Sequence, residues 1–94
     1  MTLLHPLDDL EMQRLKQGFS ALTPRERQIL ERIVNAESTL KIAYDLEIAP
    51  RTVELHRQNV LQKMHAVNAP DLVRRVAILE NTERDRDRRR SGTE

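Results

Sequence analysis

The sequence predicts an all-α protein, in which a four-helix bundle follows an extra N-terminal helix and precedes a disordered charged tail. Only two Gly and four Pro occur in 94 residues, and so few turn signals favour helices joined by short loops over a sheet. Apolar residues recur at helical spacing behind residues that are suited to cap a helix. One Tyr, one Phe and no Trp are present, so Leu, Ile and Val must form the core.

Composition limits the chain to one small domain, because 94 residues can bury a modest core but not a second one. The sequence contains no Cys, which excludes a disulfide framework and a thiolate metal site. No apolar run reaches about 18 residues, and the N-terminus lacks the pattern of a signal peptide. We therefore expect a soluble, cytoplasmic protein. The formal net charge is +1 and by itself identifies no partner.

Residues 1–20 are expected to form a short amphipathic helix or linker. Pro6 suits a first helical position, which places Asp8 and Asp9 in the first turn. Gly18 stands near the expected end. The apolar residues at roughly helical spacing are Leu7, Leu10, Met12, Leu15 and Phe19. This apolar side is expected to lie on the following domain, and pairing with a second copy is the alternative.

The next helix has the clearest start signal. Thr23 is a natural N-cap, Pro24 takes the first helical position, and Glu26 can complete a capping box with Thr23. The helix should end near Asn35. Its expected buried stripe comprises Ile29, Leu30, Ile33 and Val34.

Two further helices form a predicted helix-turn-helix. Ser38 can cap the first of them. Its expected apolar contacts are Leu40, Ile42, Ala43 and Leu46. Residues 47–49 make a short link to the second helix, over 50–64, which Pro50 begins. Two helices joined by so short a turn, the second carrying polar groups outward, are typical of this DNA-binding motif.

The helix over 50–64 has two contrasting faces. Its core face is formed by Val53, Val60, Leu61 and Met64. The opposite face carries Arg51, Leu55, Gln58 and Gln62, flanked by Thr52, Asn59 and Lys63. Amides and a guanidinium can form the paired hydrogen bonds that base edges and phosphates accept. The alternative is an ordinary solvated helix face.

The last helix is expected over 69–80, capped by Asn68. Its inward stripe comprises Leu72, Val76 and Leu79. Val73 and Ala77 form a second apolar strip, which is either a scattered surface feature or a contact between two copies. Residues 81–94 contain no large apolar side chain, so they should form a disordered, solubilising tail.

Several linked motifs resemble the LuxR/FixJ (GerE-type) DNA-binding domain. They are, in chain order, Leu22-Thr23-Pro24-Arg25-Glu26-Arg27-Gln28-Ile29-Leu30, Ile42-Ala43, Pro50-Arg51-Thr52-Val53-Glu54, His56-Arg57 and Lys63-Met64. Within that superfamily, residues 41–46 and 50–64 are most similar to the FixJ branch of response regulators. The resemblance covers about residues 20 to 80 and marks 21–80 as the DNA-binding domain.

The resemblance implies a four-helix bundle whose third helix, 50–64, enters the major groove and whose fourth, 69–80, mediates dimerisation. The implied base-facing residues are Glu54, Leu55 and Gln58. The residues expected near phosphates are Thr52, Asn59 and Lys63, which the resemblance implies, and Arg51 from the helix face. The expected dimer residues are Val73 and Ala77.

Two features depart from the family. Asn35-Ala36 replaces the usual Gly after the first bundle helix, so either Ala36 adopts a left-handed conformation, at a cost of roughly 1 kcal/mol, or Asn35 does. FixJ-type regulators also carry a receiver domain before this module, and residues 1–20 cannot build a phosphorylatable Asp pocket. We therefore expect either a free-standing module, as in GerE itself, or an excised output domain.

Enzyme activity is not expected. His5, His56 and His65 are far apart, and no His or carboxylate pair has metal-ligand spacing. No Gly-rich phosphate loop or Ser/His/Asp arrangement occurs. We therefore expect no cofactor and no metal.

These observations favour a sequence-specific bacterial transcription regulator that binds double-stranded DNA at an inverted repeat, as a dimer that is weak off DNA. RNA polymerase is a further expected partner. The alternative is a protein-interaction module of the same fold that acts on another regulator or RNA polymerase without reading DNA. Region four of a sigma factor shares the helix-turn-helix but lacks the motif at 22–26 and the Thr52-Val53-Glu54 pattern.

Overall fold

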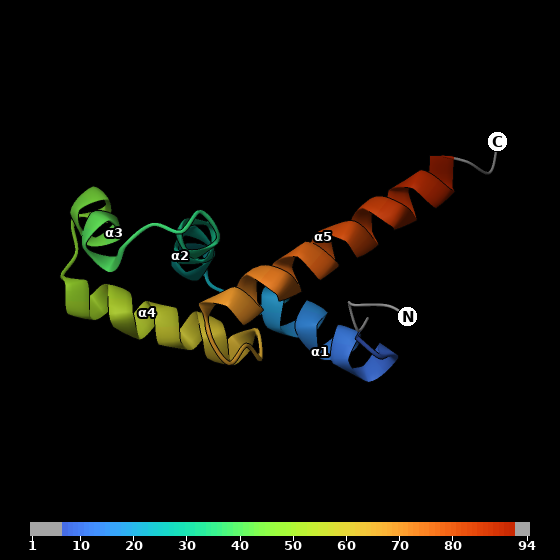
Figure 1. Cartoon of the computed structure of the whole chain (residues 1–94), viewed down its shortest axis with the longest axis horizontal. Helices are drawn as coiled ribbons and strands as arrows, with labels where there is room; N and C mark the ends of the chain where they lie inside the picture. The colour runs from blue at the N-terminus through green and yellow to red at the C-terminus, as the bar shows by residue number, and fades with distance from the viewer. Residues whose placement is uncertain (1–6, 92–94) are drawn as a thin grey trace.

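The computed structural model describes the backbone of residues 7–91 and the side chains of residues 7–84. Within this range it contains five helices and no strand, which confirms the all-α fold. The helices are α1 (Asp9–Ser20), α2 (Pro24–Val34), α3 (Thr39–Leu46), α4 (Pro50–Lys63) and α5 (Ala69–Ser91). In Figure 1, α2 and α3 lie on one side of α4, and α5 leads away from the bundle.

Helix α1 begins at Asp9, because Asp8 is its N-cap. The Asp8 carboxylate accepts a hydrogen bond from the Glu11 amide at 2.8 Å, and the Glu11 carboxylate accepts one from the Asp8 amide at 3.3 Å. This capping box satisfies two of the amides that a helix start leaves unpaired. Asp8 therefore precedes the first turn rather than lying in it, and the expected start at Pro6 lies outside the described residues.

Gly18 lies in the last turn of α1, near its end as expected, and its lack of a side chain has a packing reason. A Cβ atom at Gly18 would overlap the carbonyl oxygen of Lys63, so α1 can cross the end of α4 only at a glycine. Leu15, one turn earlier, is fully buried in the shared core. The apolar side of α1 thus packs on the bundle as expected, through Leu7, Met12, Leu15 and Phe19, but Leu10 is 56% exposed and does not join it.

Helix α2 has the predicted start and a strained end. Thr23 and Glu26 form the capping box, with bonds of 3.1 and 2.9 Å. After Val34, the Ala36 amide donates to the Ile33 carbonyl, and the next amide donates back to Arg32. This pattern requires a left-handed residue, and Ala36 supplies it with φ of 60°. Asn35 keeps a φ of −83°, which resolves the alternative in favour of Ala36.

Helix α3 begins as predicted, since the Ser38 hydroxyl accepts from the Lys41 amide at 3.1 Å. Ile42 and Ala43 are buried, but the expected contact from Leu40 is wrong, because 71% of its surface is exposed. A helix of eight residues buries only one narrow face, and Leu40 lies outside it. Glu47 then turns the chain in a left-handed conformation before α4 begins at Pro50.

Four charged side chains join α2 to α3. The Arg32 guanidinium lies 2.7 Å from both Glu37 and Asp45, and the Lys41 ammonium lies 3.0 Å from each of them. Hydrogen bonds from Arg32, followed by those from Lys41, lower the pKa of both carboxyl groups. These ion pairs tie the segment from α2 to α3 together, and none of the four side chains belongs to α4.

Helix α5 starts as predicted, because the Asp71 amide donates to the Asn68 side chain at 2.8 Å. Leu72 and Leu79 are buried and Val76 is partly buried. The expected end at residue 80 and disorder from 81 are wrong as far as Ser91, where the helix ends. No Gly or Pro stands between residues 71 and 91, and the acids and arginines of this segment recur three and four residues apart. That spacing supports a helix without a core.

Candidate nucleic-acid interface

The outward face of α4 is arranged as the sequence predicts. Val53 and Val60 are fully buried on the inner side. The exposed residues on the outer side are Arg51, Glu54, Leu55, Gln58, Asn59 and Gln62, and Thr52 is half-buried beside them. The structure therefore brings the base-facing candidates together with Arg51, Thr52 and Asn59 on one continuous surface.

Leu55 is the apolar member of this surface. Its side chain is 48% exposed, between the polar groups of Arg51 one turn before it and Gln58 one turn after it. An exposed leucine amid groups that can hydrogen-bond is suited to an apolar contact with a partner that also offers acceptors and donors. The floor of a major groove combines these groups, since thymine presents a methyl group beside polar base edges.

The start of α4 has no side-chain cap. Ala49 is the N-cap and provides no side-chain hydrogen bond, in contrast to Asp8, Thr23 and Ser38 at the starts of α1, α2 and α3. Uncapped amides at a helix start attract anions, because the helix dipole adds partial positive charge there. Arg51 and Thr52 stand in this first turn. Pro50 has no N–H and the Thr52 amide donates to the Ala49 carbonyl at 2.9 Å, so the Arg51 amide is the backbone donor left at this start.

Lys63 does not join this surface. Its Nζ atom lies 2.7 Å from Oε1 of Glu26 and 3.2 Å from the carbonyl oxygen of Ala21. Glu26 is only 5% exposed, and the hydrogen bond from Lys63, followed by that from the Thr23 amide, lowers its pKa. The ammonium group thus neutralises a buried carboxylate, which the helical wheel of α4 alone cannot reveal. The geometry does not support the expected phosphate contact of Lys63.

The surface of α3 holds two side chains that the sequence analysis did not single out as exposed. Leu40 and Tyr44 are four residues apart and are the most exposed large apolar side chains of α3. The helical wheel places both residues away from Ile42 and Ala43, which indicates exposure, whereas the apolar character of Leu40 favours a place in the core. The pair adds an exposed apolar surface to the helix-turn-helix.

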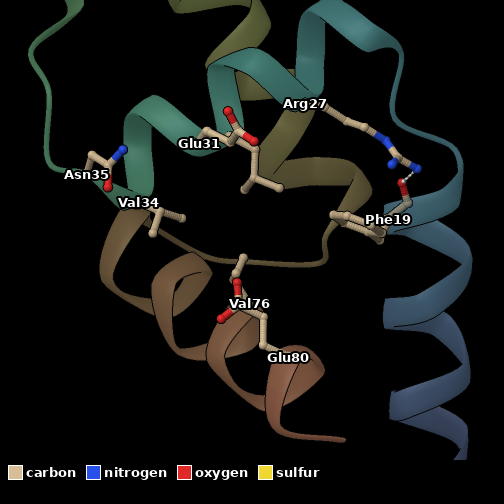
Figure 2. A pocket seen from close by; sticks show the side chains of 8 residues that line it. Phe19, Arg27, Glu31, Val34, Asn35, Val76 and Glu80 are labelled. Carbon is tan, nitrogen blue, oxygen red and sulfur yellow. Dashed lines mark hydrogen bonds between the residues drawn. The ribbon is translucent and has the colours of Figure 1, made fainter. Parts of the chain in front are cut away.

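The expected dimer residues are accessible on α5. Val73 is 39% exposed, and Ala77, one turn later, is also exposed. Beside this strip a cleft of about 300 Å³ opens between α2 and α5, with Phe19, Val34 and Val76 on its walls. Figure 2 shows Arg27 over one end of the cleft, where its guanidinium lies 4.5 Å from the Phe19 ring centre. The strip and the cleft leave this side of α5 open to a second chain.

Neither a metal site nor a membrane segment was found among the residues described. No group of three His, Cys, Asp or Glu side chains there could hold a metal ion. None of these helices combines the length and the apolar character needed to cross a bilayer.

Comparison with known proteins gives a family match and several relatives. The model of the family described as "Bacterial regulatory proteins, luxR family" matches residues 20–76. The transcriptional regulatory protein FixJ of Azorhizobium caulinodans is 54% identical over 61 residues, which are 65% of this chain and 28% of that protein. FixJ of Rhizobium meliloti is 48% identical over 60 residues, 64% of this chain and 29% of that protein.

A solved structure agrees with these relatives. The crystal structure of full-length FixJ from B. japonicum matches with a TM-score of 0.65 and 35% identity, over 76% of this chain and 35% of that one. The chain therefore spans about a third or less of the length of the FixJ proteins it matches. The shared part is their helix-turn-helix region.

Proposed function

The chain belongs to the luxR family of bacterial regulatory proteins, and from this premise we propose that it reads an operator with α4 and pairs through α5. A LuxR-family helix-turn-helix of the FixJ type is a DNA-binding module of transcription regulators. The observation that carries the finer proposal is the continuous outward face of α4, where polar side chains surround an exposed leucine.

Base recognition falls to Glu54, Leu55 and Gln58. The Gln58 amide can donate to N7 and accept from N6 of one adenine at once, and the Glu54 carboxylate can accept from a cytosine amino group. Leu55, between them, can contact a thymine methyl group. No other described side chain makes a hydrogen bond to Glu54 or Gln58, so neither must give up an internal partner to bind a base.

Phosphate contacts fall to Arg51, Thr52 and Asn59. Arg51 and Thr52 stand at the uncapped start of α4, where the helix dipole and the Arg51 amide add to the attraction for an anion. Asn59 lies on the flank of the same helix and is exposed. Lys63 is left out of this set, because its ammonium group is held by Glu26.

Dimerisation is assigned to the strip formed by Val73 and Ala77 on α5. The small side chain of Ala77 lets two helices approach closely, and the strip is too narrow to hold a stable dimer by itself. A weak dimer in solution that pairs on DNA would place two α4 helices in half-sites about one helical turn apart. The expected operator is therefore an inverted repeat.

The alternative is a protein-interaction module without DNA binding. A protein interface would favour aromatic or large apolar anchors at its centre, and the outward face of α4 offers only Leu55.

RNA polymerase is a further proposed partner, and the exposed pair Leu40 and Tyr44 on α3 suits a contact with it. Acting on chromosomal DNA, the protein would work in the bacterial cytoplasm.

Selection of binding sites from random duplex DNA tests the proposal. Recovery of an inverted repeat would support sequence reading, dimeric geometry and half-site spacing together. Failure to enrich any sequence at low salt, with a folded protein, would overturn DNA reading and favour the interaction module.

A further inference from the structure

A basic pocket lies at the other end of α4, where three separate elements meet. It has a volume of about 160 Å³ and is lined by Glu11 and Arg14 of α1, His65 after α4, and Arg75 of α5. The close crossing of α1 over the end of α4 at Gly18 holds the first pair beside His65. The pocket therefore depends on α1, most of which precedes the residues that match the family model.

The pocket lies beyond the C-terminal end of α4. His65 stands two residues after the last residue of α4, in the left-handed turn (φ of 55°) that ends the helix. In Figure 1, α1 lies beyond the C-terminal end of α4, on the side away from α3. A duplex that runs past the C-terminal end of α4 on the side of α1 would meet this pocket.

Two of the four side chains that line the pocket are arginines, the side chains best suited to bind a phosphate. Arg75 is only 14% exposed, and its Nε atom donates to Asp71 at 3.2 Å. This bond fixes the guanidinium beside the pocket that Arg75 lines. Arg14 is exposed and makes no hydrogen bond to another described side chain. Glu11 opposes an anion and Asp71 offsets part of the charge of Arg75, so the attraction depends chiefly on the exposed Arg14.

We propose that Arg14, His65 and Arg75 receive a backbone phosphate of the bound DNA. The inference rests on the proposed function. Helix α4 has 14 residues and so is about 21 Å long, whereas the major groove is about 12 Å wide. A helix longer than the groove meets the sugar-phosphate backbone at its ends. Guanidinium groups match the geometry of phosphate oxygens, so α1 adds a phosphate contact to the family's module.

Two variants that change the charge of the pocket in opposite directions test the contact. Arg14→Gln removes a positive charge from an exposed position, and Glu11→Gln removes the negative charge while its amide oxygen still accepts from the Asp8 amide. We expect Arg14→Gln to weaken binding to a mixed-sequence duplex about three- to tenfold and to reduce the salt slope by about 0.9. Glu11→Gln should strengthen binding. Thermal unfolding should show that both variants remain folded.

The reference variant is Arg51→Gln, at the start of α4. If Arg51→Gln reduces the salt slope and the two α1 variants bind as the parent does, the proposed function stands and the pocket contact is overturned. If the parent binds no duplex, both are overturned.

A free phosphate ion could bind the same pocket through the same side chains. Amide NMR spectra recorded with inorganic phosphate at constant ionic strength distinguish the two. Shifts at His65 that vanish in Arg14→Gln, together with an unchanged DNA salt slope, would assign the pocket to a free anion and overturn the DNA contact. A reduced salt slope in Arg14→Gln, with or without such shifts, supports the DNA contact.

Discussion

The Nζ atom of Lys63 lies 2.7 Å from Oε1 of Glu26, so the last residue of α4 is bonded to the carboxylate that completes the cap of α2. The same oxygen accepts from the Thr23 amide at 2.9 Å. Glu26 thus serves two helices at once. The position of the reading helix on the bundle depends on this contact as well as on apolar packing.

Lys63→Met should destabilise the fold rather than only weaken DNA binding. The substitution keeps an apolar stem of similar length but leaves the Glu26 carboxylate buried without its countercharge, at an expected cost of about 1–3 kcal/mol. Urea unfolding monitored by circular dichroism measures this cost. Lys41→Met is the matched control, since Lys41 pairs with carboxylates at a far more exposed position and its loss should change the free energy of unfolding much less. Equal effects of the two variants would contradict a special role for Lys63.

The contact also predicts a pH dependence of stability. The pKa of Glu26 in the folded protein lies below its ordinary value of 4.5, chiefly because of Lys63. Its ionised form therefore stabilises the fold fully above pH 4.5, and this contribution is lost as the pH falls through the lowered pKa. Glu26→Gln keeps the cap acceptor but not the charge. The difference in free energy of unfolding between parent and Glu26→Gln should shrink as the pH is lowered from neutral to acid, and a constant difference would refute the assignment.

The starts of α2, α3, α4 and α5 and the faces of α4 could be predicted because they depend on local signals. Thr23, Ser38 and Asn68 each accept from the amide three residues on, and the spacing of Val53 and Val60 alone defines the inner side of α4. Such features need only the residues within one or two turns.

The contacts that the sequence did not reveal join residues far apart in the chain. Lys63 meets Glu26, 37 residues earlier, and Gly18 meets the Lys63 backbone. The sequence around either partner does not indicate which distant residue it contacts. The extension of α5 to Ser91 was missed for a different reason. A lack of apolar residues indicates that a segment has no core, but it does not by itself prevent a helix from continuing.

Ala36→Gly should stabilise the protein by up to about 1 kcal/mol. Ala36 has φ of 60°, a conformation that costs a residue with a Cβ atom roughly 1 kcal/mol relative to glycine. Thermal or urea unfolding measures the gain. Gln28→Gly, at an exposed position within α2, is the control and should destabilise by about 1 kcal/mol. If both variants lost stability, the left-handed assignment of Ala36 would be wrong.

Gln58→Ala should change which sequences are bound. If Gln58 pairs with adenine, its loss removes about 1–3 kcal/mol of discrimination at one or two base positions. Repeating the site selection with the variant measures this relaxation, while affinity for mixed-sequence DNA should survive. Arg51→Ala is the contrasting variant and should weaken binding to all sequences about equally. An unchanged selected motif for Gln58→Ala would mean that a different face of α4 meets the bases.

Val73→Glu should separate half-site binding from operator binding. The substitution places two like charges against each other where two α5 helices meet, because Val73 lies exposed on the proposed contact strip. Binding to an operator with two half-sites should be lost, whereas contacts to a single half-site and the circular dichroism spectrum should be largely retained. Val67→Glu supplies the matched control, since Val67 is more exposed and lies in the turn between α4 and α5, off the strip. If Val73→Glu bound the operator as well as the parent does, either the dimer contact would lie outside α5 or the protein would act as a monomer.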